Sequence, residues 1–359
     1  MVGERREDGE DPVRRRELLV SAGLAATGTL GLPARPSHSA ARPVDAAAGL
    51  ESLLYGRPAT ADPLPLPALS KAVTRARQMF QDARYDRLAE QLPDLIAAAM
   101  VTRDHAEGDA HLAAEAALAN VYIVASAFMV KLNDDQLAWA SADRAAQAAE
   151  SSGDVLALAD ARRGVATVMR RTGRTDRARE LLIATADDIV PRRDAAPEQL
   201  SMYGALLQTA AYTAAVDGDR AEAHDLIDAA RAAATRLGRD TNHRHLAFGP
   251  TNVTLFEVSI SQVLGDNGAA IAHAQTLPPA SIPTRERQGR YWIDVARAWH
   301  QWGKPEACYR ALLAAERAAP AEVRYRPPVH RMTADLLRID RRGSLRGLRA
   351  FATRIGIPA

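Results

Sequence analysis

Cysteine, aromatic residues and lysine are all scarce in this chain of 359 residues. The single cysteine, Cys308, excludes an internal disulfide. Aromatic residues make up 5% of the chain and hydrophobic residues 47%, so a large core would consist mainly of alanine and leucine. Runs of alternating β-branched residues joined by hairpin dipeptides are missing as well. Together these shortages favour closely packed helices over sheets.

Charge is nearly balanced, because 46 basic residues face 44 acidic ones and the formal net charge is +2. This balance gives no bulk attraction to nucleic acid, so direct nucleic-acid binding is not expected. Only three basic residues are lysines, namely Lys71, Lys131 and Lys304. We attribute the excess of arginine to high-GC codon usage rather than to a need for guanidinium chemistry at each position.

Motifs that carry common enzyme chemistries are also missing. The sequence has no Walker loop, no GxSxG elbow, no HExxH pair and no glycine-rich turn that would cradle a phosphate. We therefore predict a protein that is not an enzyme and needs no cofactor.

Segment 289–320 holds the clearest positive pattern. An apolar stripe with helical spacing consists of Trp292, Val295, Ala296 and Trp299. Gly303 interrupts the stripe. A second stripe ends before Pro320 and consists of Cys308, Leu312 and Ala315. Two helices that face each other across a turn account for both stripes.

This helix pair resembles a tetratricopeptide (TPR) repeat, with cysteine at one position where a small residue is usual. One such hairpin cannot bury its own apolar face, so neighbours of the same kind are expected. Gly173, Gly218 and Gly265 are similar turn glycines, because a small residue follows each of them five positions later. The intervals between the four glycines are 45, 47 and 38 residues, longer than the roughly 34 residues of a TPR repeat. The array is therefore TPR-like.

The pattern predicts an all-α fold, a right-handed TPR-like solenoid of about six to seven antiparallel helix pairs over residues 68–359. Pairs are expected at 68–82 with 85–102, 106–131 with 134–151, 154–172 with 175–190, 198–217 with 219–237, 251–264 with 267–276, and 284–302 with 305–319. Residues 321–356 should cap the last apolar face. The arginines of this cap are expected on a solvated helix face rather than against phosphates.

Residues 1–67 are predicted to form a disordered N-terminal arm and linker, for which two interpretations compete. Arg15-Arg16 and the apolar run 18–32 look like a twin-arginine export signal with cleavage near Ala41. The run is shorter than the roughly 20 residues that span a bilayer. Alternatively, residues 11–19 (DPVRRRELL) resemble a junction found in XRE-type helix-turn-helix transcriptional regulators of high-GC bacteria. In those proteins the junction joins the DNA-binding domain to a TPR-like sensor region.

Three later segments carry the second resemblance further, namely 248–253 (FGPTNV), 283–287 (PTRER) and 323–327 (VRYRP). Ten residues precede the junction, too few for a helix-turn-helix domain, so the resemblance implies a relative without that domain or a start of translation further upstream. It also implies a cytoplasmic regulatory sensor that binds a peptide, a small ligand or a protein partner such as a DNA-binding regulator. The sequence also allows the chain to form a homo-oligomer. The export interpretation implies a scaffold for protein–protein interactions outside the membrane.

In TPR arrays the first helix of each pair lines a concave groove. Carried over from the turn glycines, the groove positions in this sequence are Arg163, Thr167, Arg170, Gln208, Tyr212, Asn252, Ser259, Gln262, Arg290, Arg297, His300 and Gln301. Asn and Gln can pair with the backbone of an extended peptide, and Arg can bind a carboxylate with two parallel hydrogen bonds. The same residues also fit a solvated helix face that has no function.

A possible metal pair is formed by His243 and His245, which lie near Asp240 and Asn242. The segment around them, GRDTNHRHLAFGP, has the composition of a connection between repeats and offers no further acidic or cysteine ligand close by. We therefore predict a loop here and no metal site.

Overall fold

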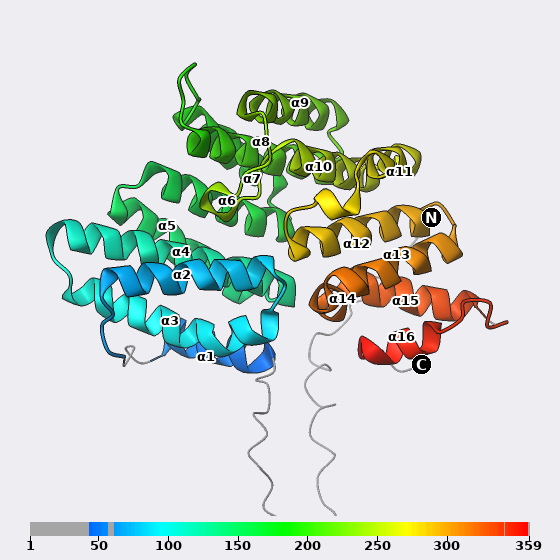
Figure 1. The fold of residues 1–359 in the computed structure, drawn as a ribbon, viewed down its shortest axis with the longest axis horizontal. Coiled ribbons are helices and arrows are strands. Elements are labelled where there is room, and N and C mark those ends of the chain that lie inside the picture. Colours follow the sequence, from blue (N-terminus) through cyan, green and yellow to red (C-terminus); the bar gives the residue numbers. More distant parts are fainter. Residues whose placement is uncertain (1–42, 57–60, 341, 358–359) are drawn as a thin grey trace, which may run out of the picture. The chain divides into compact units, whose positions relative to one another are not determined.

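The computed structural model describes residues 43–56, 61–340 and 342–357. All regular secondary structure in these ranges is helical (Figure 1), which confirms the all-α prediction. The helices are α1 (Pro43–Tyr55), α2 (Leu66–Gln81), α3 (Tyr85–His105), α4 (Gly108–Leu132), α5 (Asp135–Ser152), α6 (Val155–Arg171), α7 (Thr175–Asp188), α8 (Pro197–Asp217), α9 (Arg220–Leu237), η2 (His243–His245), α10 (Pro250–Val263), α11 (Asn267–Thr276), η3 (Pro279–Ser281), α12 (Arg285–Gln301), α13 (Pro305–Ala318), α14 (Pro320–Tyr325), α15 (Pro327–Ile339) and α16 (Leu348–Arg354). The export-like and junction-like segments, with Ala41, lie outside the described residues.

All six predicted helix pairs are present, from α2 with α3 to α12 with α13, and their ends fall within three residues of those predicted. The four turn glycines have positive φ angles between 70° and 85°, a region that glycine adopts without steric cost. Two corners lack glycine. Ala83 (φ 53°) and Asn133 (φ 62°) turn the chain after α2 and α4, so a search for turn glycines assigns no groove positions to these two pairs.

The core is built mainly from alanine and leucine, as the composition indicates. Three clusters of buried apolar side chains follow one another along the chain, the first over α1–α6, the second over α6–α10 and the third over α10–α16. On α8, Ala210, Ala211 and Ala214 are each at most 1% exposed. Because a methyl group is the whole side chain, the helix backbones can approach closely at these positions.

Helix α4 is long and apolar enough to cross a membrane by length and composition. However, 67% of its most apolar window is buried by the rest of the described chain. Its neighbours α3, α5 and α6 pack around it, so burial in the core accounts for its apolar character.

The expectation of a linker up to residue 67 is wrong for residues 43–55, which form α1. The prolines of this region suggested an extended chain, but Pro43 is the first residue of α1, where a missing N–H leaves no hydrogen bond unmade. Leu50 and Leu54 are buried against α3. The side chain of Pro93 lies so close to Gly49 that a Cβ there would be 2.9 Å from its Cγ.

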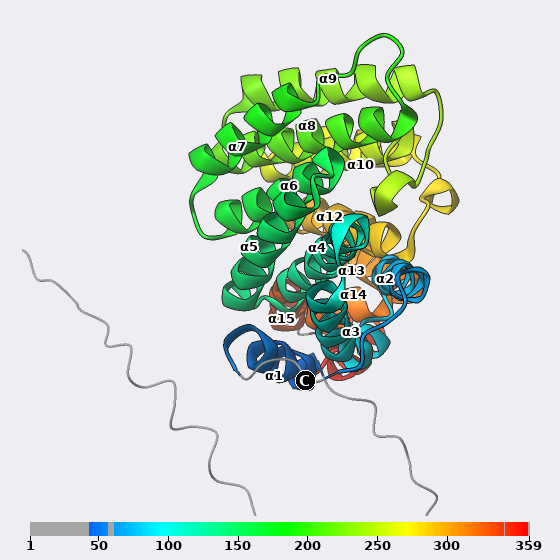
Figure 2. The same cartoon turned by 90° about the vertical axis from the view of Figure 1, so that its left-hand side faces the viewer.

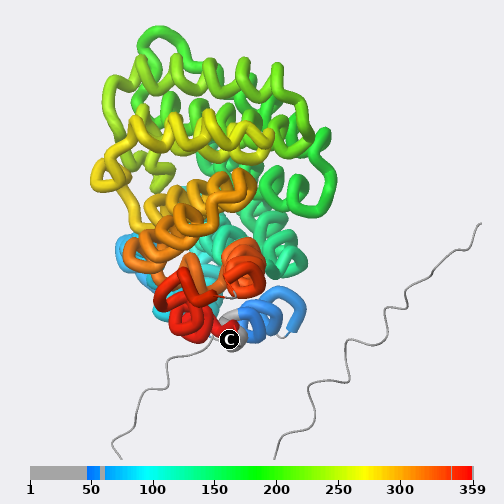
Figure 3. The backbone as a smooth tube through the Cα atoms, turned by 90° about the vertical axis from the view of Figure 1, so that its right-hand side faces the viewer, coloured from blue at the N-terminus to red at the C-terminus, as the bar shows by residue number. Residues whose placement is uncertain are grey.

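The end of the helical array packs against its beginning. Figure 2 shows α12 and α14 beside α2 and α4, and in Figure 3 the orange segments lie against the blue and cyan ones. Helix α2 contacts α12, and α4 contacts α14. The amino group of Lys131 on α4 contacts the carboxylates of Glu286 and, at 2.9 Å, Glu322. Glu322 on α14 also accepts a hydrogen bond from Tyr85 on α3 and one of 2.8 Å from Arg326. We call these five residues the closing cluster.

The predicted loop between α9 and α10 makes a second contact with the first pair. It contains only the short 3₁₀ turn η2, formed by the H-x-H segment. Arg77 on α2 donates a hydrogen bond of 3.1 Å to the carbonyl of Arg244, and Gln81 donates one of 2.9 Å to the carbonyl of His245. The backbone of this segment therefore serves as an acceptor for α2.

Four residues of the closing cluster are buried and Arg326 is half-buried; Lys131, Glu286 and Glu322 are exposed by 9%, 6% and 1%. Burial on its own would raise the pKa of Glu286, but Lys131 and Arg287 outweigh it and hold this pKa well below the ordinary value. Burial likewise opposes ionisation of Glu322, and Arg326 with Lys131 lowers its pKa. Both carboxylates are therefore ionised at neutral pH.

Replacing Lys131 by methionine should lower the free energy of unfolding in urea at pH 7 by about 3–5 kcal/mol, because two buried carboxylates lose their shared partner. The matched control is Lys71→Met, since Lys71 on α2 is exposed and its replacement should cost less than about 0.5 kcal/mol. Equal stability of the two variants would show that the cluster does not hold the closure.

The free energy of unfolding should also depend on pH, in a direction that follows from these two pKa shifts. A carboxylate whose folded-state pKa is depressed contributes stability above its unfolded-state pKa, near 4.3, and loses it as the pH falls. The unfolding free energy of the wild type should therefore drop on acidification below about pH 4.5. The drop should be smaller for Lys131→Met, because the pKa values of Glu286 and Glu322 are then less depressed.

Candidate functional site

An inner cavity of about 420 Å³ lies among the first helices of the six pairs. Its lining residues come from α2, α4, α6, α8, α10, α12, η2 and Arg326. Small-molecule sites commonly measure about 300–1,000 Å³, so the cavity is large enough for a small ligand. Because the last pair packs against the first, both ends of the array contribute to one cavity.

Positive charge dominates the cavity lining. Nine cationic side chains line it, against the two carboxylates of Glu286 and Asp294. The cations are Arg77, Lys131, Arg163, Arg170, Arg171, Arg287, Arg290, Arg297 and Arg326. Three further carboxylates, those of Asp135, Asp160 and Glu322, contact these cations from outside the lining. The cavity therefore carries more positive charge than the carboxylates around it neutralise.

Some of these cations are fixed by buried partners. The guanidinium of Arg77 lies 3.1 Å from Asp160 and donates to Asn120 at 2.5 Å. Arg163 contacts the other oxygen of Asp160 at 2.6 Å. Burial opposes ionisation of Asp160, which is 2% exposed, but Arg163 and Arg77 lower its pKa below the ordinary value. Arg77, Arg163 and Asp160 hold α2 against α6. The one carboxylate neutralises only one of the two positive charges.

Arg170 and Arg290 have a different environment, because both lie over the ring of Tyr212. Their guanidinium carbons are 4.8 Å and 5.4 Å from its centroid, a cation–π geometry. Arg170 donates a hydrogen bond of 3.2 Å to Thr213, and among the described residues no carboxylate lies within ion-pair distance of it. Arg290 is 3.6 Å from Asp294. Burial lowers the pKa of Arg170 to about 10, so it stays cationic at neutral pH.

A second part of the lining is apolar and comes mainly from one helix. Ile123, Val124, Ala127 and Val130 line the cavity along α4, and Phe80 joins them from α2. The arginines come chiefly from α6 and α12. The inner cavity is thus amphipathic, with apolar and cationic portions supplied by different helices.

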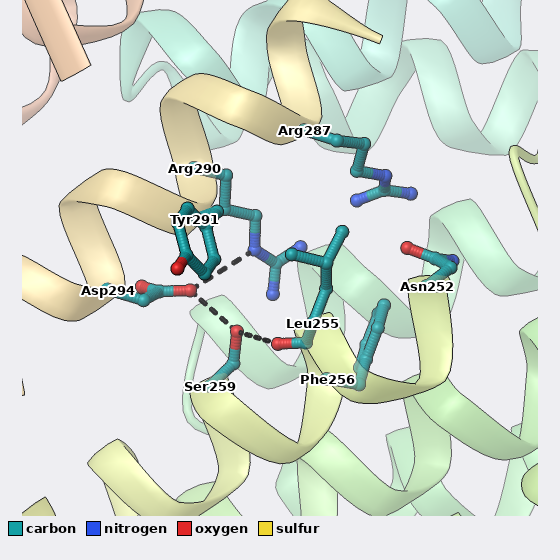
Figure 4. A pocket seen from close by; sticks show the side chains of 8 residues that line it. All are labelled: Asn252, Leu255, Phe256, Ser259, Arg287, Arg290, Tyr291 and Asp294. Atoms are coloured by element: carbon teal, nitrogen blue, oxygen red, sulfur yellow. Dashed lines mark hydrogen bonds and ion pairs between the residues drawn. The ribbon is translucent and has the colours of Figure 1, made fainter. Parts of the chain in front are cut away.

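A small pocket of about 10 Å³ adjoins the inner cavity and shares Phe256, Arg287, Arg290 and Asp294 with it (Figure 4). Asn252 lines this pocket and is 2% exposed. Its amide nitrogen donates to Gln208 at 3.0 Å, whereas its oxygen has no partner among the described residues. A buried polar atom without a partner is destabilising, so this oxygen is suited to accept a hydrogen bond from a bound group.

The structure brings together six of the twelve predicted groove residues in the inner cavity, namely Arg163, Thr167, Arg170, Tyr212, Arg290 and Arg297. Asn252 and Ser259 line the adjoining pocket, where Ser259 donates a hydrogen bond of 2.6 Å to Asp294.

The other four residues do not reach the cavity. Gln208 and Gln262 are buried between helices, with exposures of 1% and 0%. His300 and Gln301 lie at the end of α12, where the nearest polar neighbour of His300 is Asp335 at 3.3 Å on α15 and Gln301 is exposed. On α12 the lining of the cavity ends at Arg297, so the two later positions lie beyond it.

Several lining residues were not predicted from the sequence. Arg77, Phe80 and Lys131 belong to the two pairs whose corners lack glycine, so no groove position was assigned to them. Arg287 lies at the start of α12, in a segment noted only for its resemblance to a regulator landmark. Arg326 lies outside the six pairs. The sequence predicted helices at α2 and α4, but it could not show that the array closes around a cavity.

Comparison of the chain with models of known protein families and with curated protein sequences gives no match. The geometry and charge of the inner cavity are therefore what indicates its chemistry.

Replacement of Arg170 and of Arg77 by methionine should have different effects on stability. Arg77→Met should lower the free energy of unfolding by about 3–5 kcal/mol, because it leaves the buried Asp160 with one partner fewer. Arg170→Met should change it by less than about 1 kcal/mol in either direction, because the variant loses a cation–π contact but also a buried cation close to Arg290. Urea unfolding at neutral pH and low salt measures both. A loss for Arg170→Met as large as that for Arg77→Met would show that Arg170 is a structural residue.

Proposed function

We propose that this chain is a TPR-like regulatory sensor or interaction module that binds a small anionic ligand in the inner cavity. The observation that carries the proposal is the surplus of cationic side chains around a cavity of about 420 Å³. Seven of the nine cations are half-buried, and crowded, partly desolvated cations are destabilising unless they are paired or neutralised. A bound carboxylate, phosphate or sulfonate would supply the missing negative charge, and arginine binds such groups through parallel hydrogen bonds.

Binding in this cavity is linked to the closure of the array. Lys131, Glu286 and Arg326 line the cavity and also belong to the closing cluster. A ligand that contacts these side chains interacts with the second helix pair, the last pair and the segment after it together. It therefore favours the closed arrangement over any arrangement in which the two ends separate. A change in this equilibrium would alter the outer surface that a protein partner contacts.

The regulatory interpretation is supported by the helix pairs, by the glycine corners and by the junction-like residues 11–19. A DNA-binding regulator is the partner that this interpretation favours, in the cytoplasm. The twin-arginine interpretation of residues 15–32 supports an exported scaffold with the same cavity. Anion binding is common to both, so it is the property to test first.

Thermal unfolding of the full chain in inorganic phosphate or citrate, against sodium chloride at equal ionic strength, tests the proposal. A ligand that binds only the folded state stabilises it by about 2.7 kcal/mol at a hundred times its dissociation constant. The wild type should therefore show a saturable rise in the midpoint temperature. The double variant Arg170→Gln/Arg290→Gln should lose it.

Arg177→Gln is the matched control, because Arg177 on α7 has a side chain that is 76% exposed and lies outside the cavity. This variant should respond like the wild type. If all three proteins are stabilised equally, the anions act through general exclusion from the protein surface, and the proposal is refuted.

A further inference from the structure

Gly164 lies in the middle of α6 and lines the inner cavity between Arg163 and Thr167. Its backbone is helical, so no left-handed conformation requires glycine there. A Cβ built on Gly164 would meet no other atom within 4 Å. Neither the fold of the backbone nor the packing of the described residues therefore explains this glycine.

Two other helical glycines, Gly204 and Gly289, have a clear packing reason. A Cβ on Gly204 would lie 1.9 Å from the ring of Phe248, and one on Gly289 would lie 2.8 Å from the side chain of Ala319. Glycine in a helix interior is less favourable than alanine. At Gly164 this loss of helix stability is not offset by closer packing within the described residues. The missing side chain leaves free space in the cavity wall beside the arginines of α6.

The bare wall belongs to a cavity that is apolar on one part and cationic on another. The apolar part is the α4 stripe with Ile123 and Val130, and the cationic part includes Arg170 and Arg290 on the ring of Tyr212. An inorganic anion would use only the cationic part. An uncharged apolar molecule would leave Arg170 without a negative partner.

Resting on the proposed function, we infer that the ligand is a small amphipathic anion. Its carboxylate, phosphate or sulfonate group binds Arg170 and Arg290, and its apolar body lies along the α4 stripe and passes over Gly164. The unpartnered oxygen of Asn252 lies in the adjoining pocket, whose lining also includes Arg287 and Arg290 (Figure 4). It accepts a hydrogen bond from a donor on the polar end of the ligand.

Three probes test separately whether the cavity binds an anionic group and whether it binds an apolar body. Anilinonaphthalene sulfonate has an aromatic body and an anionic group, and its fluorescence rises on binding. Phenylnaphthylamine has the same rings without the sulfonate, and inorganic sulfate has the charge without a body. The full-length wild type should bind the sulfonate probe at one site, with an affinity at least about tenfold higher than for either of the other two.

Gly164→Leu tests the position of the apolar body. Leucine would extend into the cavity, so affinity for the sulfonate probe should fall at least about tenfold. The midpoint of thermal unfolding should stay the same or rise, because leucine favours a helix more than glycine does. Gly164→Ala, with a smaller side chain, keeps the test valid if the leucine variant folds poorly. Gly268→Leu is the matched control, since Gly268 is exposed on α11 and does not line the cavity.

The outcomes separate the inference from the proposed function. If Arg170→Gln/Arg290→Gln loses the sulfonate probe while Gly164→Leu and Gly164→Ala keep it, anion binding holds and the inferred position of the body is wrong. Equal affinity for the probe with and without its sulfonate, or for sulfate alone, also overturns the inference. If the double arginine variant binds the probe and responds to phosphate as the wild type does, the proposed function itself fails.

Discussion

The contact of Lys131 with Glu286 and Glu322 is the interaction on which the rest of this structure depends. Without closure, a stack of six helix pairs would leave its first and last pairs far apart and its inner wall open. Here α4 meets α12 and α14, so the inner wall becomes a cavity with lining from both ends. Buried ion pairs contribute little net stability. We interpret the closing cluster as selecting one arrangement of the two ends, because any other docking of the ends would leave buried charges without partners.

Closure also concentrates positive charge. Arg77 and Arg163 share Asp160, and Arg326 is paired with Glu322. Arg170 contacts a hydroxyl and an aromatic ring and lies near Arg290 and Arg171, with no carboxylate of the described residues within ion-pair distance. A protein selected for stability alone would have little reason to keep such a residue, whereas functional sites commonly depart from the optimum for stability. Gly164 fits the same pattern, since a helix interior favours almost any other residue.

Local features of the sequence were sufficient to predict the helices, because each pair has its own apolar stripes and most corners have glycine. Helix α1 was missed because Pro43 and the prolines that follow the helix were weighted above the spacing of Leu50 and Leu54. The closure could not be predicted, because it depends on small rotations that accumulate over six pairs. For this reason half of the predicted groove residues line the cavity, and Lys131 was noted only as one of three lysines. Arg326 had no assigned position, since it follows the last pair.

The central claim is that closure creates a binding site for a negatively charged group between Arg170 and Arg290. Anomalous diffraction from crystals of the full chain soaked in sodium bromide tests it most directly, because bromide positions are then located without reference to any assumed ligand. We predict a bromide peak in the inner cavity in contact with these guanidinium groups, at higher occupancy than on exposed arginines. Bromide peaks only on the outer surface, with none in the cavity, would contradict this account.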